Sequence, residues 1–200
     1  MIRLLNRLQD LLDATRAIDF LGPLALRAYL APIFILAGGN KLANAEHLVP
    51  YFESLGIPAP QLMVYVAGLT ELVGGWALVA GFAVRWFAIP LMITMAVAAI
   101  TAHLENGWHV LPETELTVPW EWRTDLIEQA NLRKDAARSL LQERGNYGWL
   151  TATGPFTVLK NGIEFAATYF VMLLALFFTG AGRFFSLDYW IRRAFRRTTT

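Results

Sequence analysis

The chain contains no cysteine among its 200 residues. This absence excludes a disulfide framework, a CxxC redox centre, a thiolate zinc site and an iron–sulfur cluster. Charge is scarce as well, because charged residues make up 16% of the chain and 17 basic against 16 acidic side chains leave a formal net charge of +1. So small an excess of positive charge argues against a nucleic-acid partner held by electrostatics.

Hydrophobic residues are abundant instead, at 56% of the chain, against about 45–50% in an average soluble domain. A helix needs about 20 apolar residues to cross a bilayer. Four windows meet this requirement, at residues 21–40, 62–82, 86–103 and 162–179. Buried helices of a soluble protein are the alternative, but too little polar sequence remains to cover four of them. The sequence therefore predicts an all-α fold, a four-transmembrane-helix bundle that forms a single domain over residues 1–200.

The basic residues near the ends of these windows predict the orientation. With four spans, one side of the membrane carries most of the positive charge, from Arg3, Arg7, Arg16, Arg85, Arg183, Arg192, Arg193, Arg196 and Arg197. The other side has only Lys41 and Lys160 close to the membrane. We therefore expect both termini in the cytoplasm, the loops 41–61 and 104–161 in the periplasm, and the inner membrane as the location.

Three segments outside the spans have helical patterns. Residues 2–19 place leucines on one face and polar residues opposite, which predicts an N-terminal interfacial amphipathic helix, with a helix packed on another protein as the alternative. The periplasmic loop contains a second amphipathic pattern at about 125–144, with Thr124 as its predicted N-cap. Residues 186–197 form a basic juxtamembrane tail, in which Ser186 is placed to cap a short helix.

Two ionisable residues, Arg27 and Glu71, lie well inside the predicted spans and away from their ends, where each costs about 2.5–3.5 kcal/mol or more. Glu71 falls near the bilayer midplane and Arg27 lies about 6–8 Å away in depth, at about 1.5 Å of rise per residue. The first interpretation is a buried Arg27–Glu71 pair that only fixes helix register. A protonated Glu71 bonded to Thr70 or Thr94 is another, and a proton relay is a third.

A second polar group lies at the predicted periplasmic ends of the spans. It consists of Asn40, Lys41, His103, Glu105, Asn106, Lys160, Asn161 and Glu164. His103 and Glu164 fall at the same predicted depth, so they can meet if the third and fourth spans are neighbours. Such a cluster is typical of the mouth of a ligand site, whereas interfacial snorkelling and helix capping explain it without function.

Metal binding is a separate hypothesis for part of this group. His103, Glu105, His109 and Glu164 provide two imidazoles and two carboxylates, which suit zinc, copper or iron. Their local spacing, H-x-E-x-x-x-H, matches no strong ligand motif. Haem is not expected, because two axial ligands would need paired histidines in the middle of the spans.

Several stretches resemble the DoxX family, which implies a four-helix membrane bundle. The resemblance rests on Leu26-Arg27-Ala-Tyr-Leu-Ala-Pro32, Ala37-Gly-Gly-Asn40-Lys41-Leu42 and Thr70-Glu71-Leu-Val-Gly74-Gly75. Other stretches are similar to its HvfX-like branch, namely Ile89-Pro90-Leu-Met92, His103-Leu-Glu105-Asn106-Gly107-Trp108, Asn146-Tyr-Gly-Trp149-Leu150, Asn161-Gly-Ile-Glu164-Phe-Ala-Ala-Thr-Tyr169 and Leu187-Asp-Tyr-Trp190. That branch is associated with copper-binding peptides that are made on ribosomes and then modified. The family supplies no catalytic residue to carry over.

Three functions follow as hypotheses. The first is an accessory or partner protein in copper-binding peptide maturation, export or copper handling. The second is a membrane subunit of a quinone-linked oxidoreductase, since DoxX relatives are linked to such complexes and a chain without cysteine would need quinone or a partner's cofactor. The third is a structural membrane scaffold. No self-contained catalytic motif is present, and the expected partners are the lipid bilayer and other membrane or periplasmic proteins.

Overall fold

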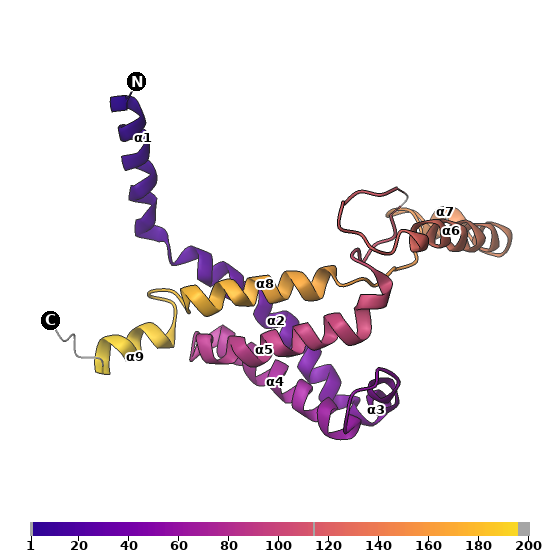
Figure 1. The fold of residues 1–200 in the computed structure, drawn as a ribbon, viewed down its shortest axis with the longest axis horizontal. Helices are drawn as coiled ribbons and strands as arrows, with labels where there is room; N and C mark the ends of the chain where they lie inside the picture. Colours follow the sequence, from indigo (N-terminus) through magenta and orange to yellow (C-terminus); the bar gives the residue numbers. More distant parts are fainter. Residues whose placement is uncertain (1, 114, 196–200) are drawn as a thin grey trace. The chain divides into compact units, whose positions relative to one another are not determined.

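The computed structural model describes residues 2–113 and 115–195, the side chain of Arg3 excepted. Over these residues the structure is all-helical, as predicted, with nine α-helices and no strand (Figure 1). They are α1 (Ile2–Ala14), α2 (Leu21–Ala43), α3 (Ala45–Ser54), α4 (Pro60–Ala80), α5 (Val84–Ala98), α6 (Asp125–Arg144), α7 (Tyr147–Leu150), α8 (Glu164–Thr179) and α9 (Leu187–Phe195). The predicted tail arginines Arg196 and Arg197 lie outside the described residues.

Three helical stretches in the described part of the chain are long and apolar enough to cross a membrane. They are Leu21–Ala43, Pro60–Ala80 and Val84–Asn106, the last of which continues α5 through the π-helical turn η2 (Ala99–His103) and the 3-10 turn η3 (Leu104–Asn106). The predicted fourth span corresponds to α8, which is apolar but has 16 residues. At about 1.5 Å per residue this is about 24 Å, less than a hydrocarbon core of about 30 Å. The structure thus supports an integral membrane protein with three full-length candidate spans.

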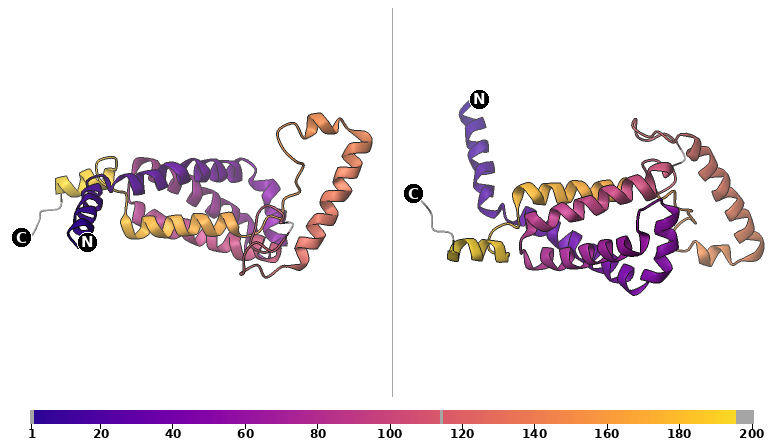
Figure 2. Two further views of the ribbon diagram at one scale, coloured as in Figure 1. Left: turned by 90° about the horizontal axis from the view of Figure 1, so that it is seen from above. Right: turned by 60° about the horizontal axis from the view of Figure 1, so that its bottom comes forward.

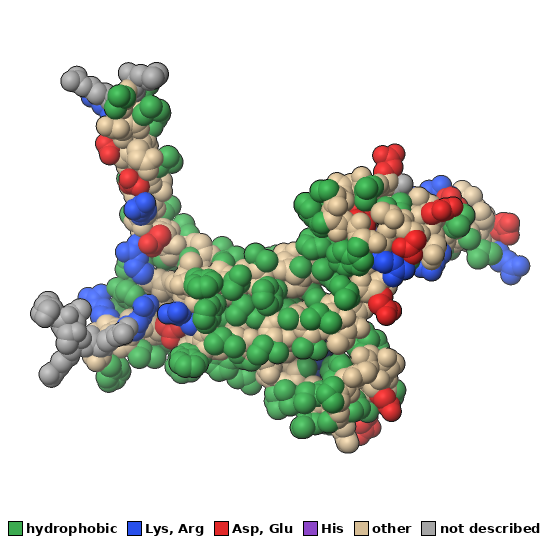
Figure 3. Space-filling view, viewed as in Figure 1, with side chains coloured by type: hydrophobic (Ala, Val, Ile, Leu, Met, Phe, Trp, Pro, Cys, Tyr) green, Lys and Arg blue, Asp and Glu red, His purple; other side chains and the backbone are tan. Residues whose placement is uncertain are grey.

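The described chain divides into two compact units. The first unit contains the described residues up to Thr94 and from Phe170 onward, and the second unit is Met95–Tyr169. Figure 3 shows mainly hydrophobic side chains on the visible face of the central helices of the first unit, while Lys, Arg, Asp and Glu side chains appear on its helix α1 and on α6 of the second unit. The first unit therefore has a surface suited to lipid, and α6 has one suited to water.

Within the first unit, α2 and α4 lie side by side in each view (Figure 2). Glycines allow this approach, because a Cβ atom on Gly38 would lie 2.6 Å from the carbonyl oxygen of Gly68. A Cβ atom on Gly75 would lie 2.9 Å from the backbone nitrogen of Ile35. Small residues at helix contacts are the usual means of close packing in membranes, so these two positions bring the polar residues of α2 and α4 together.

The helix α3 covers the first half of α4. Ala45 and Phe52 of α3 are buried against Val64 of α4, and Leu48, Val49, Ile57, Met63 and Ala67 pack around them. The loop predicted as periplasmic at 41–61 is therefore mostly helix. His47 of α3 is exposed and contributes to neither of the polar groups predicted from the sequence.

The helix α9 is tied to the start of α5. The carboxylate of Asp188 accepts hydrogen bonds from the backbone N–H groups of Ala83 (2.7 Å) and Val84 (3.1 Å). Ser186 caps α9 as predicted, since its hydroxyl accepts the N–H of Tyr189 at 3.2 Å. Thr124 is the N-cap residue of α6, as predicted, but its side chain makes no capping hydrogen bond. The position of α1 and α9 on a bilayer surface stays a prediction.

Candidate functional site

Arg27 of α2 is buried in the first unit, with 2% of its surface exposed. Its guanidinium donates to four backbone carbonyls, of Leu78 (2.7 Å), Val79 (2.9 Å), Ala181 (2.8 Å) and Phe185 (3.0 Å). The first two are among the last carbonyls of α4, which lack the N–H four residues ahead and attract a cation; the Leu78 carbonyl also accepts the N–H of Gly81 at 3.3 Å. Arg27 therefore joins three segments of the chain by neutralising the C-terminal end of α4.

Gly81 makes room for this arginine. It follows the end of α4 with a φ of +63°, and a Cβ atom there would lie 2.6 Å from Nη2 of Arg27. A side chain would thus clash with the guanidinium as well as strain the backbone. Gly81 therefore serves both as the end of α4 and as the space that the Arg27 guanidinium occupies.

The predicted Arg27–Glu71 pair is wrong. Glu71 of α4 binds Lys41 instead, with Oε2 and Nζ 2.6 Å apart. Depth along the helices made the Arg27 pairing reasonable, but depth says nothing about which way each side chain turns. The α2–α4 contact turns Lys41 toward Glu71 and Arg27 toward the carbonyls at the end of α4.

The Lys41–Glu71 pair is the most buried ion pair among the described residues of the first unit. The Glu71 side chain is 4% exposed and that of Lys41 is 27% exposed. Both residues stand on candidate membrane spans, where the backbone N–H groups are used within the helices, so the ammonium group is the chief donor to the carboxylate. Ionisable groups in spans are functional candidates by default, and this pair is the candidate site of the first unit. Asn40 beside it is exposed.

In the second unit, the residues before α8 pair with the segment 107–110. The N–H groups of Gly162, Ile163 and Glu164 donate to the carbonyls of His109, Gly107 and Trp108, at 2.9–3.0 Å. A Cβ atom on Gly162 would lie 2.5–2.6 Å from the same three carbonyl oxygens. The orphan N–H groups at the start of α8 are thus satisfied by a neighbouring loop, and glycine is the residue that permits it.

A buried Lys160–Glu121 pair fixes this loop. The Lys160 side chain is 3% exposed and that of Glu121 is fully buried. The carboxylate also accepts the backbone N–H of Arg123 (2.8 Å) and of Trp108 (3.1 Å). Burial by itself raises the pKa of Glu121, but the hydrogen bonds from Lys160, Arg123 and Trp108 outweigh it and lower this pKa below its ordinary value.

His109 lies between two carboxylates of the second unit. Its Nε2 contacts Oε1 of Glu113, and its Nδ1 lies 3.5 Å from Oε2 of Glu164. The same Glu164 oxygen accepts the N–H of Val110 at 3.0 Å. Glu113 is 8% exposed, and its Oε2 is buried with no hydrogen-bond partner among the described residues. This carboxylate–imidazole–carboxylate chain can hold or pass a proton.

Two further residues of the polar group predicted at the ends of the spans, His103 and Asn106, contact the same backbone carbonyl. Nδ1 of His103 lies 2.9 Å from the carbonyl oxygen of Asn161, and Nδ2 of Asn106 donates to the same oxygen at 3.3 Å. His103 and Glu164 therefore lie near the same turn, but each has a different partner. Glu105 is exposed, and its carbonyl accepts Arg123.

The four predicted metal ligands do not form one site. In the part of the chain that the structure describes, no group of three or more His, Asp or Glu residues is arranged to hold a metal ion. The geometry gives the reason, because Glu113 and Glu164 face opposite nitrogens of His109. One ion cannot bind both sides of an imidazole ring, so the arrangement favours hydrogen bonding over ligation.

Sequence reasoning missed three residues of these clusters, namely Glu113, Glu121 and Asp188. Glu121 could have been recognised, because a carboxylate between Trp120 and Trp122 indicates partly apolar surroundings in which it would need a partner. Glu113 had a signal as well, four residues after His109, but only within a stretch whose local structure is irregular. Asp188 acts on backbone groups 104 and 105 residues away, which no local pattern reveals.

Comparison with known proteins gives one match. Residues 22–104 match the sequence model of the DoxX family. No curated protein and no solved structure matches the chain. The matched residues include Arg27, Lys41 and Glu71, which supports the DoxX resemblance and an integral membrane protein; residues 105–200, with α6 and the Lys160–Glu121 pair, lie beyond the match.

Proposed function

We propose that this DoxX-like membrane protein is an accessory protein without a catalytic centre of its own, acting in the maturation or export of a copper-binding peptide or in copper handling. One observation carries the non-catalytic part of the proposal. The deeply buried charges all have partners within the chain, because Arg27 is hydrogen-bonded to four backbone carbonyls and Glu71 and Glu121 are each paired with a lysine. Groups paired in this way stabilise a structure, whereas a reaction centre would hold at least one of them free for substrate.

The copper-peptide part of the proposal has a different support. It rests on the HvfX-like stretches, several of which fall in the second unit, such as residues 103–108 and 161–169. There an irregular loop is fixed by backbone pairing and by the Lys160–Glu121 pair. Because a buried ion pair keeps this loop in one conformation, the loop is suited to present a fixed surface to another protein.

The proposal includes a topology. Four spans, with α8 as the shortest, would place both termini in the cytoplasm and α6 in the periplasm. The nine arginines assigned to the cytoplasmic side support this orientation by the positive-inside rule. A span of about 24 Å needs the bilayer to thin locally or the residues next to it to extend it.

A quinone-linked role is the second candidate, and the Lys41–Glu71 pair favours it. A carboxylate beside an ammonium group inside a span is a place where a proton can be stored or passed. In that case the Lys41 ammonium, or Glu71 in its protonated form, would donate a hydrogen bond to a quinone carbonyl, and the electrons would come from a partner's cofactor.

One experiment separates the two candidates. The full-length protein is purified from its native membranes, and its lipid extract is examined for quinone by mass spectrometry. Its copper-binding peptide partner is then tested for binding to the protein in nanodiscs. The accessory function predicts saturable binding of the peptide and no stoichiometric quinone.

The matched variant for this test is Lys41→Met combined with Glu71→Leu, which removes both charges and leaves none unpaired. The accessory function predicts unchanged peptide binding and copper tolerance in this double variant. Stoichiometric quinone in the wild-type protein, lost in the double variant, would overturn the accessory function in favour of the quinone-linked one. Absence of peptide binding would also overturn it.

A further inference from the structure

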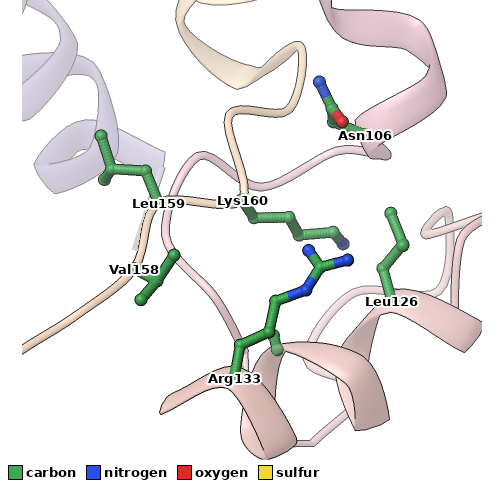
Figure 4. Close-up of a pocket in the computed structure, with 7 residues that line it drawn as sticks. Asn106, Leu126, Arg133, Val158, Leu159 and Lys160 are labelled. Carbon is green, nitrogen blue, oxygen red and sulfur yellow. The ribbon is translucent and has the colours of Figure 1, made fainter. Parts of the chain in front are cut away.

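The second unit contains a pocket that the clusters above do not explain (Figure 4). Its lining includes Asn106 at the end of η3, Leu126, Ala130 and Arg133 of α6, and Leu159 and Lys160 before α8. Three segments distant in sequence therefore build it. Two of its residues, Asn106 and Lys160, belong to the polar group predicted at the ends of the spans, whereas its residues on α6 were not predicted as part of any site.

The pocket has an apolar part and a cationic part. Leu126, Ala130 and Leu159 provide the apolar wall. Figure 4 shows the ends of the Arg133 and Lys160 side chains directed toward one another. Two like charges that converge repel each other, and an anion bound between them would turn the repulsion into two attractions.

The contacts of the two cations leave a positive excess. Lys160 donates to Glu121, which neutralises one charge. Arg133 donates to the side-chain oxygen of Gln129 at 3.2 Å, a neutral acceptor. The Arg133 guanidinium has five N–H donors and this one acceptor among the described residues, so it is the main donor for an anion, with the Lys160 ammonium adding its charge. Asn106 also lines the pocket, but its Nδ2 already donates to two backbone carbonyls, at 3.4 and 3.3 Å.

The position of the pocket along the chain indicates its surroundings. Asn106 is the last residue of the candidate span Val84–Asn106, and Lys160 precedes the apolar helix α8, which begins at Glu164. Residues at the ends of spans lie at the level of the lipid headgroups. Basic pockets between membrane helices bind anionic lipid headgroups on the cytoplasmic side, and the same attraction between a phosphate and Arg or Lys side chains acts at the opposite surface wherever anionic phospholipid is present.

We propose that this pocket binds the phosphate group of an anionic phospholipid, between Arg133 and Lys160, with the start of the acyl chains against Leu126 and Leu159. The bound lipid would hold α6 at the membrane surface through Arg133. This binding does not depend on the proposed accessory function, because it involves neither a peptide nor copper.

The test uses the full-length protein in detergent and native mass spectrometry. Phosphatidylglycerol, phosphatidylcholine and inorganic phosphate are titrated separately. The expected result is retention of phosphatidylglycerol at least tenfold more tightly than phosphatidylcholine, and no competition by inorganic phosphate at comparable concentration. Equal retention of the two lipids would overturn the proposal, and so would full competition by inorganic phosphate, which would indicate a site for a soluble anion.

Variants on α6 provide the matched comparison. Arg133→Gln is expected to weaken phosphatidylglycerol binding about tenfold, because it removes a charged hydrogen-bond donor, and Arg133→Lys should restore most of it. Arg138→Gln is the control, since Arg138 is exposed on the same helix and faces Asp135 at 3.8 Å. Equal effects of Arg133→Gln and Arg138→Gln would show a general charge effect and overturn the site.

A second variant fills the pocket instead of changing its charge. Ala130→Trp is expected to abolish specific retention of phosphatidylglycerol while helix content, measured by circular dichroism, stays unchanged. Retention of the lipid in a folded Ala130→Trp protein would overturn the proposed location. Peptide binding in the same variants should be unaffected, which keeps a failure of this inference distinct from a failure of the proposed function.

Discussion

The two units each contain one buried Lys–Glu pair, and the pairs are held in different ways. Lys41 and Glu71 join two helices whose backbone amides are already used, so each charge depends mainly on the other. Glu121 in the second unit is bound by Lys160 and also by two backbone N–H groups of an irregular loop. A carboxylate on a membrane helix therefore relies on one side chain, whereas a carboxylate in a loop can recruit the backbone itself.

The largest expected effect comes from breaking the pair in the first unit. Lys41→Met leaves Glu71 buried and without its cation, and we expect a loss of about 3–5 kcal/mol in the free energy of unfolding. The double variant Lys41→Met/Glu71→Leu should recover most of this loss, because it removes both desolvated charges. The unfolding midpoints of the two variants in detergent measure the loss and the recovery. A double variant as unstable as Lys41→Met would contradict the pairing.

The corresponding change in the second unit should cost less. Glu121→Gln leaves the Lys160 charge unpaired but keeps an oxygen that can accept one N–H group, so we expect a loss of about 1–3 kcal/mol. The loss should be confined to the loop. Hydrogen exchange of residues 104–123 should rise while that of α2 and α4 is unchanged, and a uniform rise would mean that the two pairs are not independent.

The close approach of α2 and α4 can be tested with two adjacent glycines. A Cβ atom on Gly38 would lie 2.9 Å from Cα of Leu72, whereas one on Gly39 meets nothing within 4 Å. We expect Gly38→Ala to destabilise the protein by about 1–3 kcal/mol through overpacking. Gly39→Ala should be neutral or stabilising by a few tenths of a kcal/mol in a helix. Similar unfolding midpoints for the two variants would mean that the backbones are not in contact.

The smallest expected effect is a pH dependence of the second unit. Because the pKa of Glu121 is lowered by folding, its contribution to stability is complete above the ordinary value of 4.5 and is lost as the pH falls below it. We expect cleavage of residues 104–123 by an acid protease to increase as the pH falls below 4.5. The Glu121→Gln protein serves as the control and should lack this part of the pH dependence.

Much of the fold follows from local patterns. The apolar windows at 21–40, 62–82 and 86–103 correspond to the three candidate spans. They could be predicted because the thickness of the hydrocarbon core sets the length of apolar sequence that a span needs, and this length is visible in the sequence. The fourth window predicted α8 as an apolar helix but overestimated its length, since its first two residues, Gly162 and Ile163, pair with the loop 107–110 instead.

The candidate sites could be predicted only in part. The sequence identified Arg27, Glu71, Lys41 and Glu164 as ions in or near the membrane, because their cost there is independent of any neighbour. Their partners could not be predicted, since the rotation of one helix against another decides which side chains face each other. Glu121 was missed for the same reason, as its partner Lys160 is 39 residues away.

The absence of cysteine, the near-zero net charge and the apolar runs by themselves determined an all-helical membrane protein without thiol chemistry. Only the tertiary structure decided that Lys41 and not Arg27 binds Glu71, that Arg27 closes the end of α4, and that His109 lies between two carboxylates. Composition and periodicity determine whether a segment forms a helix and whether it is apolar enough to cross a membrane, because both properties depend only on residues close together in the sequence. Pairing energies depend on distances of a few ångströms between residues far apart in sequence, and only the packed chain sets those distances.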